Sequence, residues 1–182
     1  MEFHYEFAMG NKWTFEMKPI KTYLHRKIVQ HQRILIPFAG QTRFYIPKKQ
    51  ITYIDIDPTM PQPCIYGDSL KILDVFVSQN KKFDLIISDP PYTFFQSVQT
   101  YKMNKENVKM QTITKIKEMY QDLLEPRGEI IHFGYNSTGM GQKRGFEKTH
   151  LHIITLGGSH NDILMLTEKY PQVGTLDQFW GT

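Results

Sequence analysis

Alternation of short apolar runs with helical patterns is the feature that most restricts the fold of this 182-residue chain. Residues 33–37 and 83–88 are apolar at most positions, as in strands of a parallel sheet that is covered on both faces. Strands that alternate with helices predict an α/β fold. The expected strands are Arg33–Pro37, Ile51–Ile56, Cys64–Tyr66, Phe83–Ser88, Glu129–Phe133, His150–Thr155 and Asp162–Glu168.

Helices are expected between these strands and before them. Ser69–Gln79 and Asn107–Leu124 have apolar residues at helical spacing, and residues 125–128, with a proline and a glycine, end the second helix. A further helix is expected near Thr22–Val29. Residues 156–161, which contain two glycines, separate the last two strands and predict an antiparallel hairpin.

Length and composition predict one domain. The chain is long enough for a single well-packed core, so we expect one domain over residues 1–182, with residues 1–32 as an approach segment. Cys64 has no cysteine partner, the N-terminus lacks a signal-peptide pattern, and no apolar stretch approaches the length of a membrane span. We therefore expect an intracellular protein. The net charge of +4 suits a polyanionic partner.

Polar residues and a glycine follow the first three expected strands. In an open parallel sheet, ligands bind beyond the carboxyl ends of the strands, near the switch in strand order. Gly40 allows a ligand close to the backbone, and Asp55 lies where ribose hydroxyls are held. Each residue also has a structural explanation, because Gly40 can form a simple turn and Asp68 or Ser69 can cap a helix.

The sequence Asp89-Pro90-Pro91-Tyr92 directly follows the fourth expected strand. These residue types suit a flipped base: Asp89 and the carbonyl of Pro90 accept hydrogen bonds from an exocyclic amine, and Tyr92 stacks on the ring. The structural alternative is a strand exit that Asp89 caps and two prolines stiffen. A glycine turn, acidic strand ends and this tetrapeptide in that order favour the functional interpretation.

With these motifs the chain resembles the S-adenosylmethionine-dependent amino methyltransferases, in particular the adenine-N6 group with the Asp-Pro-Pro-Tyr motif. The resemblance spans residues 33–168. It implies a Rossmann-like class I methyltransferase fold, with a mostly parallel seven-stranded sheet and an antiparallel C-terminal hairpin. The implied cofactor is S-adenosyl-L-methionine, and the implied activity is methyl transfer to N6 of a flipped adenine in DNA. No metal and no separate target-recognition domain are expected.

Position by position, the resemblance also implies which residues form the site. Phe38 and Gly40 would line the methionine side of the cofactor, Asp55 would hold its ribose, and Asp68 would meet its adenine amine. The catalytic set is Asp89, Pro90, Pro91 and Tyr92. The cofactor set is Pro37, Phe38, Ala39, Gly40, Asp55, Ile56, Asp68, Ser69 and Asp89.

The chain departs from the family pattern at two places. Thr42 stands where the family usually has a second glycine. Residues 41–50, which include Pro47, are short for a helical crossover between parallel strands. Both departures concern the first cofactor motif, so they bear on cofactor binding.

Two loops mix aromatic, basic and glycine residues and are expected to contact nucleic acid. Phe94, Lys102 and Lys105 follow the catalytic loop, and Lys143 and Arg144 follow the fifth strand. The alternative is that both are solvated loops without a ligand. His150 and His152 share one face of a strand, where a structural role is favoured over a metal site.

Two rival functions remain open from the sequence. One is an RNA methyltransferase acting on adenine N6 or guanine N2, since the same loop can bind either amine. The other is a non-catalytic nucleic-acid-binding subunit with a degenerate cofactor site. Because no target-recognition domain is expected, specificity is either low or supplied by a partner subunit, and a homodimer is a further expectation.

Overall fold

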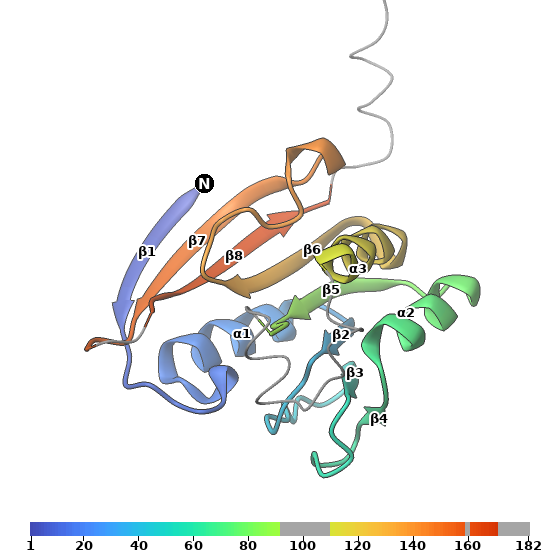
Figure 1. Ribbon diagram of the computed structural model, residues 1–182, viewed down its shortest axis with the longest axis horizontal. Helices are drawn as coiled ribbons and strands as arrows, with labels where there is room; N and C mark the ends of the chain where they lie inside the picture. Colours follow the sequence, from blue (N-terminus) through green and yellow to red (C-terminus); the bar gives the residue numbers. More distant parts are fainter. Residues whose placement is uncertain (92–109, 159–160, 171–182) are drawn as a thin grey trace, which may run out of the picture.

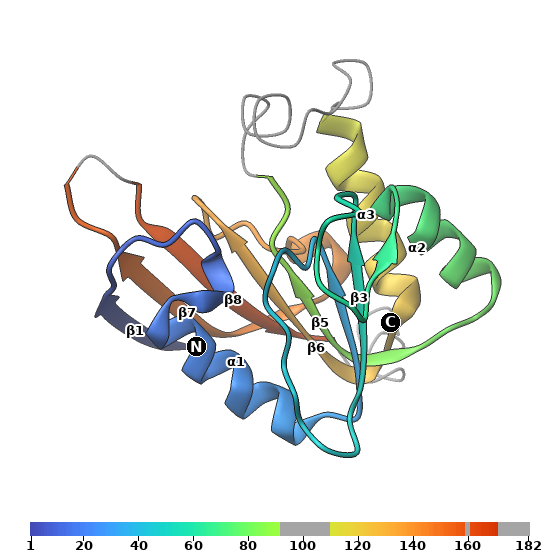
Figure 2. The same ribbon diagram turned by 90° about the horizontal axis from the view of Figure 1, so that it is seen from below.

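The computed structural model describes residues 1–91, 110–158 and 161–170 and shows an α/β fold (Figure 1). One helix, α1 (Lys18–Gln30), covers one face of a central sheet, and α2 (Ser69–Ser78) and α3 (Met110–Leu123) cover the other (Figure 2). The strands are β1 (Glu2–Phe7), β2 (Arg33–Pro37), β3 (Gln50–Asp55), β4 (Ile65–Tyr66), β5 (Phe83–Ser88), β6 (Leu124–Gly134), β7 (Glu147–Thr155) and β8 (Ile163–Lys169).

The strand order is β1-β7-β8-β6-β5-β2-β3-β4. Strands β2 to β6 are parallel, whereas β8 runs antiparallel to both β6 and β7. This confirms the expected mostly parallel sheet with a C-terminal antiparallel hairpin. The chain leaves β2 toward β3 on one side and later returns to β5 on the other, so the switch in strand order lies between β2 and β5.

The apolar strands are buried on both faces, which explains their continuous apolar runs. Along β2, Ile34 and Ile36 pack with α1, while Leu35 packs with α2 and α3. The same alternation holds in β5, where Leu85 and Ile87 face α1 and Ile86 faces the other helices. The bounds of β2 and β5 match the sequence prediction residue for residue.

Within the described residues the sheet has eight strands, one more than the seven expected. The additional strand is β1, which lies parallel to β7 at the edge farthest from β4 (Figure 1). It lies in residues 1–32, which were expected only to lead into the domain. Its partner, β7, lies about 150 residues away along the chain, with Glu2 opposite His150. No local pattern in the sequence therefore predicts this pairing.

Two connections differ from a regular alternation of strand and helix. No helix occurs in residues 38–49 between β2 and β3, as Pro47 and the short length predicted. The face that a crossover helix would cover is covered instead by α1, which precedes the sheet in sequence. Residues 125–128 end α3 as expected, but the structure includes them in β6, with Arg127 at a φ of 67°.

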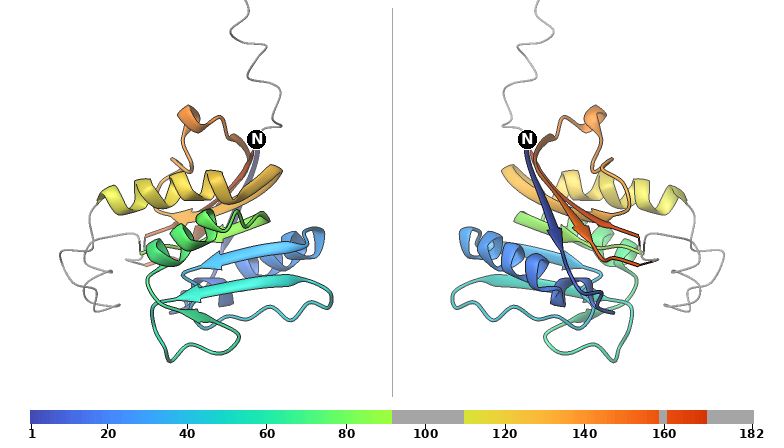
Figure 3. Two further views of the ribbon diagram at one scale, coloured as in Figure 1. Left: turned by 90° about the vertical axis from the view of Figure 1, so that its right-hand side faces the viewer. Right: turned by 90° about the vertical axis from the view of Figure 1, so that its left-hand side faces the viewer.

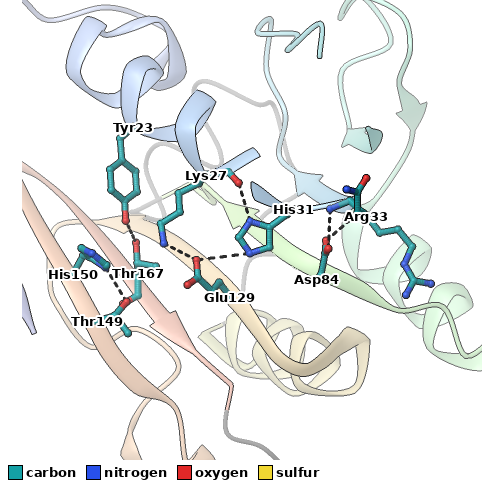
Figure 4. A network of polar contacts seen from close by, with 10 residues as sticks. Tyr23, Lys27, His31, Arg33, Asp84, Glu129, Thr149, His150 and Thr167 are labelled. Carbon is teal, nitrogen blue, oxygen red and sulfur yellow. Dashed lines mark hydrogen bonds and ion pairs between the residues drawn. The ribbon is translucent and has the colours of Figure 1, made fainter. Parts of the chain in front are cut away.

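Polar contacts hold α1 on the sheet (Figure 4). The hydroxyls of Tyr23 and Thr167 share a buried hydrogen bond of 2.7 Å, and Lys27 donates to Glu129 at 2.6 Å. Immediately after the helix, the Asp84 carboxylate accepts hydrogen bonds from the backbone N–H groups of Gln32 and Arg33. The Tyr23–Thr167 bond is buried and neutral, whereas the partly buried Lys27–Glu129 bond is charge-assisted and therefore stronger.

Candidate active site

The carboxyl ends of β2 and β5 lie side by side at the switch in strand order. Leu35 and Ile86 are paired in the parallel ladder, and both strands run on to end at Pro37 and Ser88. The glycine turn that follows β2 and the Asp89 segment that follows β5 therefore begin at the same edge of the sheet. This edge is where parallel α/β sheets bind ligands.

The glycine turn is tied to the end of β3 by the Asp55 carboxylate. Asp55 Oδ2 accepts the Gly40 N–H at 2.7 Å, and Asp55 Oδ1 accepts the Asp57 N–H at 3.0 Å. Phe38 and Gly40 both have positive φ, at 61° and 57°, which bends the backbone sharply. Asp55 is buried, and among the described residues each of its carboxylate oxygens accepts one of the two hydrogen bonds that it can accept.

Asp68 caps the helix that follows β4. Its Oδ1 accepts the Leu70 N–H at 2.9 Å, and Ser69 behind it is buried. The structural explanation for Asp68 is thus confirmed, while its other oxygen makes no hydrogen bond within the described residues. Ile56 directly follows Asp55 at the end of β3 and is 40% exposed.

Residues before the first helix cover the glycine turn, which the sequence did not predict. A Cβ at Gly40 would lie 3.1 Å from the Trp13 ring, and the Thr42 side chain is buried. Glu16 accepts a hydrogen bond from Lys21 at 2.6 Å, and this bond, with a smaller effect of the nearby Thr42 hydroxyl, lowers the pKa of the Glu16 carboxyl. Thr42, where the resembling methyltransferases usually have a second glycine, is therefore buried close to the N-terminal segment.

Asp89, Pro90 and Pro91 emerge half-buried from the end of β5. The residue before them, Ser88, is buried and shares a hydrogen bond of 2.9 Å with the Tyr120 hydroxyl of α3. This bond fixes the point at which the chain leaves the sheet. The other predicted residues of this region, Tyr92, Phe94, Lys102 and Lys105, lie outside the described residues.

The loop after β6, residues 135–146, carries the two other predicted nucleic-acid residues. Lys143 is exposed. Arg144 donates to the Met140 carbonyl at 3.0 Å and lies 3.8 Å from the Glu118 carboxylate, so its guanidinium binds its own loop and α3. Lysine side chains also hold this loop, because Lys117 donates to the Gly139 carbonyl and Lys148 to the Ser137 carbonyl.

A buried carboxylate lies beneath the same loop. Glu168 of β8 accepts the Met140 N–H at 2.6 Å, and burial raises the pKa of its carboxyl. His132 Nε2 lies 3.6 Å from Glu168, but burial and the nearby Lys117 lower the pKa of His132 to about 3, so the imidazole is neutral. Glu168 therefore fixes the loop through the backbone of Met140.

The histidines of β7 have structural contacts, as expected. His152 is buried, stacks on His4 at 4.3 Å between ring centroids and packs against Tyr23 at 4.5 Å. Within residues 1–91, 110–158 and 161–170, no group of three or more His, Cys, Asp or Glu side chains is placed to hold a metal ion. No helix in that part of the chain is long and apolar enough to cross a membrane.

Comparison with solved structures identifies the fold. The chain superposes on TrmN from Thermus thermophilus over 85% of its own length, with a TM-score of 0.59 and 14% identity. It matches the N-methyltransferase NodS from Bradyrhizobium japonicum WM9 with a TM-score of 0.60 and 12% identity over 85% of this chain and 98% of that one. The chain has the methyltransferase fold.

A further neighbour was solved with SAH bound. This protein, SMU.776, matches with a TM-score of 0.60 and 13% identity over 82% of this chain. The chain spans about half the length of TrmN and of SMU.776, 49% in each case. No family model and no curated protein sequence matches this methyltransferase-fold chain, so the likeness rests on three-dimensional structure.

Proposed function

We propose that the protein transfers a methyl group from S-adenosyl-L-methionine to the exocyclic N6 amino group of adenine in DNA. The observation that carries this proposal is the arrangement at the switch in strand order. There the Asp55-bound glycine turn after β2 lies beside the Asp89-Pro90-Pro91 segment after β5. A methyl donor and an acceptor amine need adjacent sites, and these two segments supply them on neighbouring strands.

The residues around the turn fit the cofactor. Asp55 can accept ribose hydroxyls, the second oxygen of Asp68 can accept the adenine amine, and the exposed Ile56 can pack on the adenine ring. The fold neighbour SMU.776 was solved with SAH, the demethylated form of this cofactor. When bound, S-adenosylmethionine supplies a methyl group on a positively charged sulfur.

The proposed role of the Asp89-Pro90 segment is to bind and polarise the amine that accepts the methyl group. The adenine N6 lone pair is delocalised into the ring and is a poor nucleophile. Asp89 and the Pro90 carbonyl would accept its two hydrogens and direct the lone pair toward the methyl carbon. As the nitrogen–carbon bond forms, the carbon–sulfur bond breaks and the amine loses one proton to Asp89 or to water. Most of the rate then comes from positioning and electrostatic preorganisation.

A parallel assay tests the substrate. Tritiated methyl transfer to duplex DNA, single-stranded DNA and total RNA, followed by nucleoside identification, should yield N6-methyl-2′-deoxyadenosine from DNA. Labelled N6-methyladenosine or N2-methylguanosine from RNA alone would replace the DNA proposal with the RNA one. The test separates the substrates because the methylated nucleoside identifies both the base and the sugar.

One observation favours a second candidate, a nucleic-acid-binding subunit that does not use the cofactor. Thr42 is buried against the N-terminal segment, and the Trp13 ring lies over Gly40, so the turn is more closely covered than a free glycine-rich loop. Calorimetry with S-adenosylmethionine distinguishes the two candidates. Absence of binding would favour the subunit.

Asp55→Ala should weaken S-adenosylmethionine binding by on the order of tenfold or more, equivalent to about 1.5–3 kcal/mol. The substitution removes the proposed ribose acceptor and also frees the Gly40 N–H that holds the turn. Calorimetry measures the affinity, with thermal unfolding to verify the fold. Asp57→Ala is the matched control, since within the described residues the Asp57 carboxylate accepts hydrogen bonds only from Thr59. This variant should bind the cofactor like the wild type. If Asp57→Ala alone lost affinity, Asp57 would be the ribose ligand.

Lys143→Ala should weaken DNA binding equally across unrelated sequences and reduce the slope of log affinity against log salt by about one unit. Lys143 is exposed on the loop after β6, whereas Arg144 is engaged with Met140 and Glu118. Fluorescence anisotropy at several salt concentrations measures the slope. The exposed Lys71 of α2 provides the control, and equal effects of Lys71→Ala and Lys143→Ala would indicate only a change in net charge.

A further inference from the structure

The first strand presents an uncovered apolar row at a free edge of the sheet. Phe3, Tyr5 and Phe7 alternate along β1, Met1 and Met9 flank the strand at the same spacing, and each is between 60% and 80% exposed. The other edge of β1 pairs with β7, and no strand of the described residues pairs with its outer edge (Figure 3). Exposed apolar edge strands are sites of further strand pairing.

Residues 1–9 lack three features that commonly protect an edge strand from pairing, namely basic residues, proline and a bulge. They contain no lysine, arginine or proline, and β1 pairs with β7 in continuous register from Glu2 to Phe7 without a bulge. Two glutamates in this short segment also disfavour a polyanionic ligand. A protein strand is therefore the better occupant of this edge.

We propose that β1 pairs antiparallel with β1 of a second copy of the chain, about a two-fold axis at Tyr5. A two-fold axis perpendicular to the sheet makes identical edge strands antiparallel and places the residue on the axis opposite its own counterpart. Every other residue lies opposite the residue that is equally far from the axis on its other side. With the axis at Tyr5, Phe3 lies opposite Phe7 of the second copy. On the other face, His4 lies opposite Glu6 of the second copy.

With this register, the side chains that lie opposite each other are compatible on both faces of the strand. An axis at His4 would place Glu2 opposite Glu6, and an axis at Glu6 would place two Glu6 carboxylates together, both of which are repulsive. An axis at Phe3 would leave Phe7 and Met9 uncovered. Among these axes, the one at Tyr5 covers the aromatic row from Phe3 to Phe7 and places the His4 imidazole opposite the Glu6 carboxylate.

The charged residues of β1 support the same choice. Glu2 already lies 3.3 Å from His150 and 3.7 Å from His4 within its own chain. Glu6 has no ion pair within the described residues, so His4 of the second copy would supply its partner. The pairing would join two sheets at the edge opposite β4 and leave the β2–β5 site open in both copies.

Sedimentation velocity from about 1 to about 100 μM, a range that spans ordinary dimer affinities, should show a monomer–dimer equilibrium for the wild-type chain. Tyr5→Lys should be monomeric throughout, because it places two ammonium groups at the axis. Tyr5 is 71% exposed, so the fold should persist by circular dichroism. Tyr45→Lys, at another exposed tyrosine, should dimerise like the wild type. A monomeric wild type, an open-ended aggregate, or a dimer that survives Tyr5→Lys would overturn the proposal.

Charge exchange and cross-linking test the register. Glu6→Lys should weaken the dimer at least tenfold, because it places a lysine opposite His4, and adding His4→Glu should restore it. An axis at His4 predicts the opposite, a stronger dimer for Glu6→Lys. In a Cys64→Ser background, Tyr5→Cys should form an intermolecular disulfide on mild oxidation, since paired Cα atoms in an antiparallel ladder lie within bridging distance. Tyr45→Cys should not, and failure of Tyr5→Cys to cross-link would overturn the register.

Discussion

Asp89→Ala should reduce methyl transfer by about a hundredfold to a thousandfold, the loss expected when one group that stabilises a transition state is removed. Asp89 was placed in both the catalytic and the cofactor set, and we propose that its carboxylate acts on the acceptor amine. The affinity for S-adenosylmethionine should then change little. Single-turnover measurement of methyl transfer, together with calorimetry of the cofactor, separates these two effects. The Ser88–Tyr120 hydrogen bond holds the end of β5, so the position of this strand end should not depend on the Asp89 carboxylate.

A matched control for Asp89→Ala is Asp74→Ala, at an exposed aspartate of α2. It removes the same charge from the protein and should leave turnover unchanged. If Asp89→Ala retained most of the wild-type turnover, the carboxylate would be only a cap of the turn. The amine-binding proposal for this segment would then be wrong.

Gly139→Ala should destabilise the protein by about 3 kcal/mol or more, the size expected when a buried carboxylate loses its hydrogen bond and the backbone is strained. Gly139 has a φ of 55°, and a Cβ at this position would overlap the Glu168 carboxylate. Glu168 is fully buried and accepts the Met140 N–H, so it has no room to move aside without losing that bond. Urea unfolding followed by circular dichroism measures the change.

Gly141→Ala supplies a close control in the same loop. Gly141 also has a positive φ, 83°, but no atom lies within 4 Å of an added Cβ. Gly141→Ala should therefore show only the backbone cost, about 1 kcal/mol. Equal destabilisation by the two variants would mean that the contact between Gly139 and Glu168 contributes little. If Gly139→Ala loses more stability than Gly141→Ala, it should also lower the affinity for DNA, because the loop that carries Lys143 would lose its anchor.

Much of the fold was predictable because it depends on local periodicity. Strands β2 and β5 match their predicted bounds, since a strand buried on two faces is apolar at successive positions. The buried stripe of α3, with Ile116, Tyr120 and Leu123, follows helical spacing and was also predicted. The absence of a helix in residues 38–49 followed from Pro47 and the short connection.

The candidate site was predictable only in part. Asp55 and Asp68 were recognised as strand-end carboxylates, and the structure adds the backbone N–H groups that donate hydrogen bonds to each of them. Arg144 was expected to meet phosphate, but it contacts Met140 and Glu118. The predictions for Tyr92, Phe94, Lys102 and Lys105 stay predictions, since these residues lie outside the described part of the chain.

The sequence by itself determined the α/β class, the apolar strands and the order of the motifs, because hydrophobic periodicity and turn residues act over a few neighbouring positions. Tertiary structure alone decided three features: the pairing of β1 with β7, the cover of Trp13 over Gly40, and the burial of Glu168 beneath Met140. Each joins segments far apart in the chain or turns one side chain toward a particular backbone group. Such contacts are selected by the packing of the whole domain, and no local pattern of residue types encodes them.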